Sequence, residues 1–533
     1  MPIFKINIKW QKERYKDVEC NTDESPEKFK AVLFSLTGVP PSRQKVMMPG
    51  KILGDENYDG IKLKDGATVM LMGTADEIPP TEQAYISTEE PATTNECTLR
   101  LPFGLVNLGN TCYMNAAIQL LYSIPEVRTA LKIFSPPQTA MGLNSPESLV
   151  INMRLLFNSM DKAEQPVIPA VFVTCLRNVC PQFATRLSNE GEKGNDGSLL
   201  SMLGARFAQQ DANECWVELV HALQRVQINP CTVTSLPEIF ENTRSLGSWN
   251  LVERYFTGHL LCKLTCTETE EEATETRETF TQLSCFINQD VKFLHTGIRN
   301  GFEGTVTKHS ASLGRNAVYK KNSVLTRLPA YLSIHFVRFF YKEDKQLNAK
   351  ILKDVKFPLE LDLFSFCSEA LQKDLIPIRE KMRQQADYEV HSFSNKQKTA
   401  TSTKDSKGPN PAKNPELFEP YSLPGDVGSN NSGFYELMGV LSHQGRTSSS
   451  GHYVAWVKVE ENWIKFDDDT VTCVTPEDIL RLSGGGDWHC AYVLLYGPKR
   501  VLKSIPPIEP ASSAMHVEVD RSAKDVHGGD RAD

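Results

Sequence analysis

A cysteine at the expected start of a helix is the first residue that could do covalent chemistry. The segment GLVNLGNTCYMNAAIQLLYSIPEV spans residues 104–127, where Met114, Ile118 and Leu121 recur at the spacing of one apolar helix face. The first turn of this helix would hold Cys112, and free amide groups there stabilise a thiolate over a thiol. Cys112 is therefore a candidate nucleophile, and the alternative is an inert, buried cysteine.

A histidine and a carboxylate later in the chain could serve this cysteine. The segment SHQGRTSSSGHYVAWVKV holds two histidines, and only His452 opens the aromatic strand after the turn. His335, within AYLSIHFVRFF, fits a structural histidine better. Asp467 follows in NWIKFDDDTV, at a distance that two antiparallel strands joined by a turn can span. Nucleophile, base and orienting carboxylate are the parts of a papain-like triad, and Asp468 is the alternative carboxylate.

Six segments in a fixed order carry a family resemblance. GLVNLGNTCYMN and the pair GHYVAWVK and WIKFDDD resemble the cysteine and histidine boxes of the ubiquitin-specific proteases. QQDANEC, LPAYLSIHFVRF and AYVLLY resemble other boxes of that family. The resemblance covers residues 101–497. It implies an α+β, papain-like domain of fingers, palm and thumb, which hydrolyses the bond after the C-terminal glycine of ubiquitin through an acyl-enzyme.

The resemblance also implies roles for individual residues. Cys112 is similar to the family's nucleophile, His452 to its general base and Asp467, rather than Asp468, to the residue that orients the base. Asn107 is similar to the side-chain donor of the oxyanion hole, with the Cys112 amide as the second donor. The alternative for Asn107 is a turn-forming asparagine beside a glycine.

Substrate-binding and gating residues follow from the same resemblance. Three residues are expected to bind ubiquitin: Gln209, Asp211 and Tyr453. Asp211 would contact the arginine-containing tail of ubiquitin, and the alternative is a solvated position on a helix. Two loops, 339–350 and 445–450, are expected to cover the groove of a weakly active free enzyme. The gating residues are Phe339, Phe340, Gly445, Ser448 and Ser449. A phosphate on Ser448 or Ser449 would reposition the second loop.

The first 75 residues predict a separate, small α+β unit. Alternating apolar residues predict a strand: Phe4, Ile6, Ile8 and Trp10. A helix capped by Ser25 is predicted to begin at Pro26 and to stop before Gly38, with the apolar face Phe29, Val32, Leu33 and Leu36. GVPPSRQKVMMPGKIL and LKDGATVMLM resemble ubiquitin-like β-grasp domains. The Gly-Gly tail of a ubiquitin precursor is missing, so the resemblance implies a permanent docking domain.

Strand alternation places one set of apolar residues on the outside of this unit. If Val46, Val69 and Leu71 fill the core, the opposite face carries Met47, Met70 and Met72. Methionines form adaptable binding surfaces, and packing inside the unit is the alternative. Together with the protease boxes, this unit is similar to the proteasome-associated members of the family. The expected partners are therefore ubiquitin, polyubiquitin chains and the regulatory particle of the 26S proteasome.

Composition limits the remaining domains and functions. We expect a flexible linker at 76–98, a catalytic domain at 99–500 with a disordered insert at 383–415, and a disordered tail at 501–533. The net charge of −8 argues against binding to nucleic acid, and neither a membrane span nor a signal peptide is evident. Thirteen cysteines without framework spacing predict reduced thiols and a cytoplasmic or nuclear location.

No cofactor or metal is predicted. Many family members bind zinc through two Cys-x-x-Cys pairs, whereas this chain offers Cys262 and Cys266, with Cys285 isolated beyond the acidic run at 268–278. That run would be a solvated loop or would face ubiquitin. The sequence therefore predicts a ubiquitinyl hydrolase of the thiol protease class. A non-catalytic, ubiquitin-binding scaffold of the proteasome and a protease for another ubiquitin-like modifier remain the alternatives.

Overall fold

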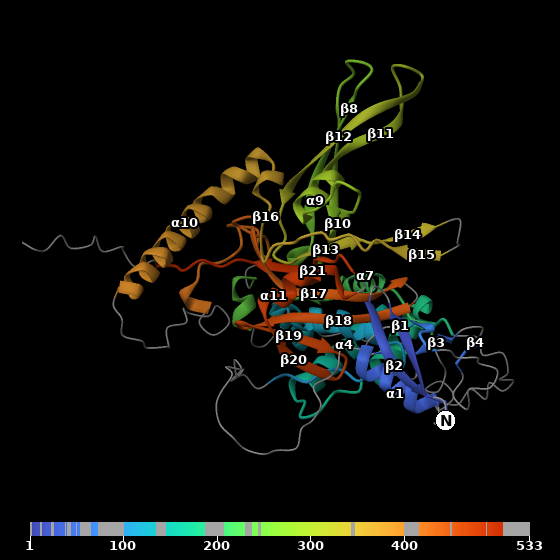
Figure 1. Cartoon of the computed structure of the whole chain (residues 1–533). Helices are drawn as coiled ribbons and strands as arrows, with labels where there is room; N and C mark the ends of the chain where they lie inside the picture. Colours follow the sequence, from blue (N-terminus) through green and yellow to red (C-terminus); the bar gives the residue numbers. More distant parts are fainter. Residues whose placement is uncertain are drawn as a thin grey trace, which may run out of the picture. The chain divides into compact units, whose positions relative to one another are not determined.

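The computed structural model divides the chain into two compact units, Met1–Asn95 and Glu96–Asp533 (Figure 1). The residues it describes are 3–10, 13–22, 26–37, 39, 44–48, 51–53, 65–72, 101–134, 145–186, 207–229, 237–243, 247–342, 347–398, 415–447, 450–486 and 488–504. Within these ranges, none of the helices has the length and apolar character that crossing a bilayer requires.

The first unit is a β-grasp fold in which one helix packs on a mixed sheet. Its strands lie in the order β2-β1-β5-β3-β4, with β1 and β5 parallel. The elements are β1 (Ile3–Trp10), β2 (Glu13–Asn21), α1 (Pro26–Thr37), β3 (Lys45–Met48), β4 (Lys51–Ile52) and β5 (Thr68–Met72). Ile6, Ile8, Phe29 and Leu33 are buried between the sheet and the helix, as alternation and helical spacing predict.

The predicted apolar face of α1 is wrong at one position. Val32 is exposed, whereas Lys30 is buried and its carbonyl accepts a hydrogen bond from the buried Gln44 amide. The buried side of the helix follows the four-residue spacing of Phe29, Leu33 and Thr37. Val32, three positions after Phe29, therefore lies at the edge of this buried side. The Leu36 side chain and Ser25 lie outside the described residues.

The methionines of the first unit lie on its outer face. Val46, Val69 and Leu71 are buried, while Met47, Met70 and Met72 are 44%, 44% and 51% exposed. Met47 is directly opposite Met70 in the β3–β5 ladder, and Met72 pairs with Lys45. The three methionines therefore form one apolar strip across two neighbouring strands.

The first part of the second unit is mostly helical. Its helices are α2 (Cys112–Tyr122), α3 (Pro125–Ile133), α4 (Pro146–Asp161), α5 (Ala170–Val179), η3 (Pro181–Ala184), α7 (Ala212–Leu223), η4 (Glu238–Thr243) and α8 (Leu251–Tyr255), with the short pair β6 (Gln227–Ile228) and β7 (Trp249–Asn250). This is the thumb. Ten consecutive residues of α2 are buried, from Cys112 to Leu121, because other helices and the main sheet cover all of its sides.

The main sheet, the palm, carries the histidine box. Its principal strand order is β10-β13-β21-β17-β18-β19-β20, while β15 and β16 each pair with a part of β17, and β14 pairs with β15. The strands are β10 (Gln282–Phe286), β13 (Leu332–Val337), β14 (Phe339–Lys342), β15 (Leu347–Lys350), β16 (Glu360–Asp362), β17 (Phe434–Thr447), β18 (Ser450–Val459), β19 (Asn462–Asp467), β20 (Thr470–Val474) and β21 (Cys490–Pro498). Three further helices accompany it: α9 (Leu294–Phe302), α11 (Pro476–Leu480) and η8 (Arg481–Ser483).

A second sheet of four strands projects from the palm as the fingers (Figure 1). Its order is β11-β12-β8-β9, with β8 (Gly258–Cys266), β9 (Thr274–Phe280), β11 (Glu303–Ser310) and β12 (Arg315–Arg327). The acidic run is not simply a solvated loop, because its second half belongs to β9. In its first half, Glu268 pairs with Arg315, and Glu271 accepts hydrogen bonds from Ser312 and Tyr319.

Two boundaries expected from composition differ from the structure. The helix α10 (Glu369–Lys398) follows η6 (Phe364–Phe366) and includes residues 383–398, so the prediction of disorder from 383 is wrong for this part. Arg379 anchors the helix through two hydrogen bonds to Asp362. The chain resumes at η7 (Pro415–Leu417), and Val501 is buried after β21, so order extends past residue 500. Polar composition alone could not reveal a helix held by such ion pairs.

Candidate active site

Cys112 is the first residue of α2 and is almost fully buried. The extended segment before it approaches the palm so closely that a side chain at Gly104 would overlap the carbonyl oxygen of Asp468. The amide of Leu105 donates to the same carbonyl at 2.9 Å. Gly104 therefore allows the cysteine box and the histidine box to meet through their backbones.

His452 and Asp467 lie on adjacent strands and are hydrogen-bonded. The distance between His452 Nε2 and Asp467 Oδ1 is 2.6 Å. A carboxylate can only accept, so Nε2 is the donor and Nδ1 is left to interact with Cys112, which is the second polar neighbour of the ring. The structure thus brings together the three residues that the sequence proposed as a triad.

The hydrogen bond to Asp467 and the proximity of Cys112 raise the pKa of His452 to about 10. The same hydrogen bond and the Lys465 ammonium lower the pKa of Asp467 below its usual range. An imidazolium is therefore the stable form of His452 near neutral pH, with a carboxylate on one side and the cysteine on the other. This charge pattern suits a thiolate–imidazolium pair.

Asp468, the alternative third residue, has a different set of partners. Its carboxylate accepts one hydrogen bond from Asn107 and one from Asn115, each at 2.8 Å. Its own φ of +53° turns the chain sharply after β19. Asp468 therefore joins the segment before Cys112 and the helix after it to the histidine box.

The contacts of Asn107 show the turn-forming role, while its role as an oxyanion donor stays a prediction. Its Oδ1 accepts from the amides of Gly109 and Thr111 at 2.9 and 3.2 Å, as in a turn-forming asparagine. One Nδ2 hydrogen is directed to Asp468, and an amide group carries a second one. The orientation of the Asn107 amide is thus fixed beside Cys112.

The expected substrate-binding residues have internal contacts. Asp211 is the N-cap of α7, accepting from the Asn213 and Glu214 amides, and its second oxygen accepts from Tyr492 at 2.6 Å. The pattern Asp-x-x-Glu was a capping signal that the sequence interpretation missed. Tyr453 was predicted to bind the substrate. Its side chain is 1% exposed and lies in the core, so this prediction is wrong. The buried Nε2 of Gln209 has no hydrogen-bond partner in the described part of the chain.

The expected gating residues belong largely to paired strands. Phe339 begins β14, and its half-buried ring contacts His443 and Tyr492. Phe340 pairs with Ala349 across the β14–β15 hairpin. Gly445 lies within β17, so it belongs to a strand and not to the loop that was predicted to begin there. Ser448 and Ser449 lie outside the described residues.

The two predicted loops contact each other. Ala349 of β15 pairs with Thr447 of β17, and the buried Lys350 Nζ donates to the His443 carbonyl at 2.6 Å. Gly445 and Gly451 have φ values of +129° and +128°. A side chain at Gly451 would overlap the Gln444 carbonyl and the His443 ring, so this part of the ladder requires glycine.

Lys465 is a site residue that the sequence interpretation missed. Its Nζ lies 2.8 Å from Asp467 Oδ2. The signal was present in WIKFDD, because residues two positions apart on a strand point to the same side. Charge alone gave no reason to select this lysine from the 58 lysines and arginines of the chain.

The three cysteines considered for zinc do not form a recognisable set of ligands. Cys262 and Cys266 lie on β8 of the fingers, and Cys285 lies on β10, in the apolar core of the palm. The pKa of the Cys285 thiol is raised to about 12 by burial, which disfavours the thiolate that zinc requires. The absence of a metal stays a prediction.

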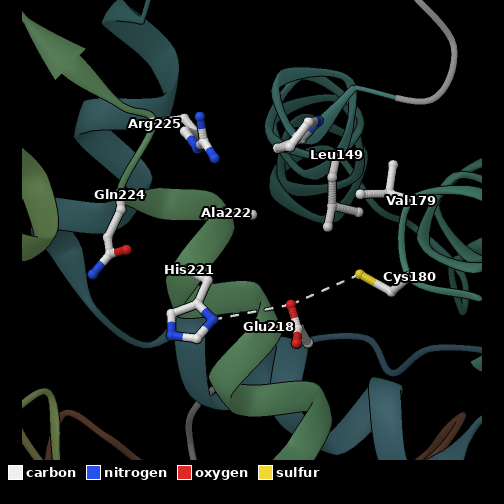
Figure 2. Close-up of a pocket in the computed structure, with 9 residues that line it drawn as sticks. Leu149, Val179, Cys180, Glu218, His221, Ala222, Gln224 and Arg225 are labelled. Carbon is white, nitrogen blue, oxygen red and sulfur yellow. Dashed lines mark hydrogen bonds and ion pairs between the residues drawn. The ribbon is translucent and has the colours of Figure 1, made fainter. Parts of the chain in front are cut away.

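A separate pocket of about 380 Å³ lies between α4, α5 and α7 (Figure 2). Leu149, Val179 and Ala222 give it apolar walls, and Glu218 lies between Cys180 and His221, 4.0 Å from each. Burial and Glu218 raise the pKa of Cys180 to about 11, so this thiol is protonated near neutral pH. The Cys180–Glu218–His221 group therefore lacks an activated nucleophile.

Comparisons with known proteins agree with the geometry. The family model described as "Ubiquitin carboxyl-terminal hydrolase" matches residues 103–496, and the "Ubiquitin family" model matches residues 6–76. The chain is 38% identical over 531 residues to ubiquitin carboxyl-terminal hydrolase 14 of Caenorhabditis elegans, covering 98% of both proteins. It is 38% identical to ubiquitin carboxyl-terminal hydrolase 7 of Arabidopsis thaliana, covering 92% of this chain and 98% of the relative.

A similar solved structure is the SAGA Ubp8/Sgf11/Sus1/Sgf73 DUB module bound to ubiquitin aldehyde, with a TM-score of 0.46 and 19% identity over 75% of this chain and 70% of that one. The family matches include both the cysteine and the histidine boxes. The similarity to ubiquitin carboxyl-terminal hydrolases over more than nine-tenths of this chain supports an enzyme rather than a non-catalytic scaffold. The chain belongs to the ubiquitin carboxyl-terminal hydrolase family and is a deubiquitinating cysteine protease with an N-terminal ubiquitin-like domain.

Proposed function

We propose that Cys112 attacks the carbonyl carbon of the C-terminal glycine of ubiquitin and forms a thioester acyl-enzyme. The observation that carries this proposal is the position of His452 between Cys112 and Asp467, with 2.6 Å between Nε2 and Oδ1. The thiolate forms the C–S bond, the imidazolium gives its proton to the departing amine, and His452 then deprotonates the water that releases ubiquitin.

Asn107 and the Cys112 amide serve in this proposal as donors to the oxyanion. The hydrogen bond from Asn107 to Asp468 fixes the amide before the substrate arrives, so that little reorganisation is needed during the reaction. Asp467 orients His452 through Nε2 and stabilises its charged form.

The test uses the full chain and ubiquitin that carries a C-terminal electrophile. We expect one covalent adduct, and peptide mapping should place it on Cys112. The buried, protonated Cys180 is the internal comparison, since it should stay unmodified. An adduct on another cysteine, or none with folded protein, would contradict the assignment.

We further propose that the enzyme acts at the proteasome in the cytoplasm and nucleus, where it trims ubiquitin from proteasome substrates. Support comes from the resemblance of the complete chain to proteasome-associated family members. The exposed strip of Met47, Met70 and Met72 offers an apolar contact for a receptor subunit of the regulatory particle. A tether between the two units would then give the protease a high effective concentration near arriving ubiquitin chains.

We also propose that the β14–β15 hairpin, together with the adjoining end of the β17–β18 ladder, limits access of the ubiquitin tail in the free enzyme. The pairing of Ala349 with Thr447 supports a joint movement of the two segments. Replacing residues 341–348 by Asn-Gly keeps a hairpin turn but shortens this cover. The folded variant should hydrolyse a ubiquitin amide faster than the parent without proteasome, and an equal or lower rate would count against gating.

A further inference from the structure

The Asp467 carboxylate is held from two sides. Its Oδ1 accepts from His452, and its Oδ2 lies 2.8 Å from the ammonium of Lys465. The His452 and Lys465 side chains belong to different strands, so the carboxylate bridges β18 and β19. A charged hydrogen bond of this length is among the stronger polar contacts in proteins.

Lys465 is itself held in place by an aromatic ring. Trp456 lies directly opposite Lys465 in the β18–β19 ladder, and the ammonium is 5.5 Å from the centre of the indole ring. The indole N–H donates to Ser442 Oγ at 2.8 Å, which fixes the ring against β17. With a 22% exposed side chain, Lys465 has little of the freedom of a surface lysine.

The other charged groups near Asp467 do not replace this lysine. His489 faces the same region from the segment before β21, but burial and the positive charges of Lys465 and His452 lower its pKa to about 4. His489 is therefore neutral near pH 7, with Nδ1 within 3.2 Å of Ser442 Oγ. Asp468 is directed to Asn107 and Asn115 instead.

We propose that Lys465 is a positioning residue, which holds the Asp467 carboxylate in the rotation that presents Oδ1 to His452. This inference rests on the proposed function of Cys112 and His452. Without Lys465, the carboxylate would keep one partner and could rotate about its terminal torsion, which is soft for aspartate. His452 would then lose part of its fixed orientation toward Cys112, and a small misplacement of a catalytic group reduces the rate strongly.

The test compares Lys465→Met, Lys465→Gln and Lys465→Arg with the parent enzyme on ubiquitin bearing a C-terminal fluorogenic amide. For Lys465→Met we expect kcat to fall about tenfold to a hundredfold, with KM within twofold, because orientation rather than binding is lost. The hydrogen bond from His452, which is the largest cause of the lowered pKa of Asp467, remains in the variant, so Asp467 stays ionised and the pH profile between 5 and 8 should keep its parental shape. Arginine keeps the charge and should restore most of kcat.

Lys458→Met is the matched control. Lys458 lies on the neighbouring strand of the same sheet and pairs with Glu436 at 3.6 Å, so the substitution removes a comparable ion pair away from Asp467. The control should keep the parental kcat. If Lys465→Met does not fold, as judged from its Tm, kcat and KM are compared for Lys465→Gln instead.

Two results would overturn the inference. One is a parental kcat in the folded Lys465→Met or Lys465→Gln variant, and the other is a loss of kcat that Lys465→Arg does not recover. Cys112→Ala is measured in parallel, because it shows whether the positioning role of Lys465 or the proposed function itself has failed. An active Cys112→Ala enzyme would refute the proposed mechanism itself, whereas an inactive one beside a fully active Lys465→Met refutes only the positioning role.

Discussion

Asn107 donates a hydrogen bond of 2.8 Å to Asp468, across 361 positions of the sequence. The same carboxylate accepts from Asn115 on α2, so it holds both sides of the Cys112 segment. The thumb and the palm therefore share a polar contact immediately beside the proposed nucleophile. Asp468 contributes to the site through this contact, although Asp467 is the residue beside His452.

Replacing Asp468 by alanine should lower kcat about a hundredfold, because the proposed oxyanion donor loses the acceptor that orients it. Steady-state hydrolysis of a ubiquitin amide measures the effect. Glu460→Ala is the matched control for backbone strain, since Glu460 has a φ of +55° against +53° for Asp468. If both variants lose a comparable part of their activity, the cause is backbone strain and not the loss of the hydrogen bonds to Asp468.

Asp467→Asn should change the pH dependence as well as the rate. The hydrogen bond to Asp467 is the largest cause of the raised pKa of His452, about 10, so the imidazolium in the variant loses its proton at lower pH. We expect a strongly reduced kcat and an alkaline limb that begins at lower pH than in the parent. A pH–rate profile from 5 to 10.5 measures both, and an unmoved alkaline limb would contradict the assigned partner.

Gly451→Ala should disturb the ladder beside His452. The added carbon would lie 2.1 Å from the Gln444 carbonyl and 2.6 Å from His443 Nε2, and φ is +128°. We expect a loss of more than about 1 kcal/mol in the free energy of unfolding and a reduced kcat. Gly304→Ala in β11 is the control, because nothing lies within 4 Å of its added carbon. Urea unfolding should distinguish the two, and equal stabilities would contradict this account of Gly451.

The methionine strip predicts a separation of docking from catalysis. Met47→Asp combined with Met72→Asp would place two charges in the proposed apolar contact, while the core residues Val46, Val69 and Leu71 stay unchanged. The double variant should fold and hydrolyse a small ubiquitin amide at the parental rate, but no longer co-purify with the proteasome. Undiminished co-purification would place the docking surface elsewhere.

Sequence pattern was most informative where the local period decides the outcome. Alternation correctly divided Val69 and Leu71 from Met70 and Met72, because a half-buried strand has only two sides. Helical spacing was less reliable, as the exposed Val32 shows, since it does not define the edge of a buried face. A hairpin pattern brought His452 near Asp467, but only motif order brought Cys112 to them, because it lies 340 residues before His452.

Several of the missed features depend on contacts between distant segments. Asp211 binds Tyr492, and Lys350 binds the His443 carbonyl, although neither pair is adjacent in any sequence pattern. Likewise, polar composition could not show that Arg379 and Asp362 would anchor the long helix α10. Such contacts become visible only once the order of strands in the palm is known.

The most direct measurement of the central claim is the hydrolysis of a ubiquitin amide by Cys112→Ala, with binding of intact ubiquitin measured on the same preparation. The variant removes only the sulfur from a buried position at the start of α2. The account predicts that binding is retained while turnover falls to the background rate, because covalent catalysis fails without its nucleophile. Turnover near the parental rate in this folded, ubiquitin-binding variant would contradict the account.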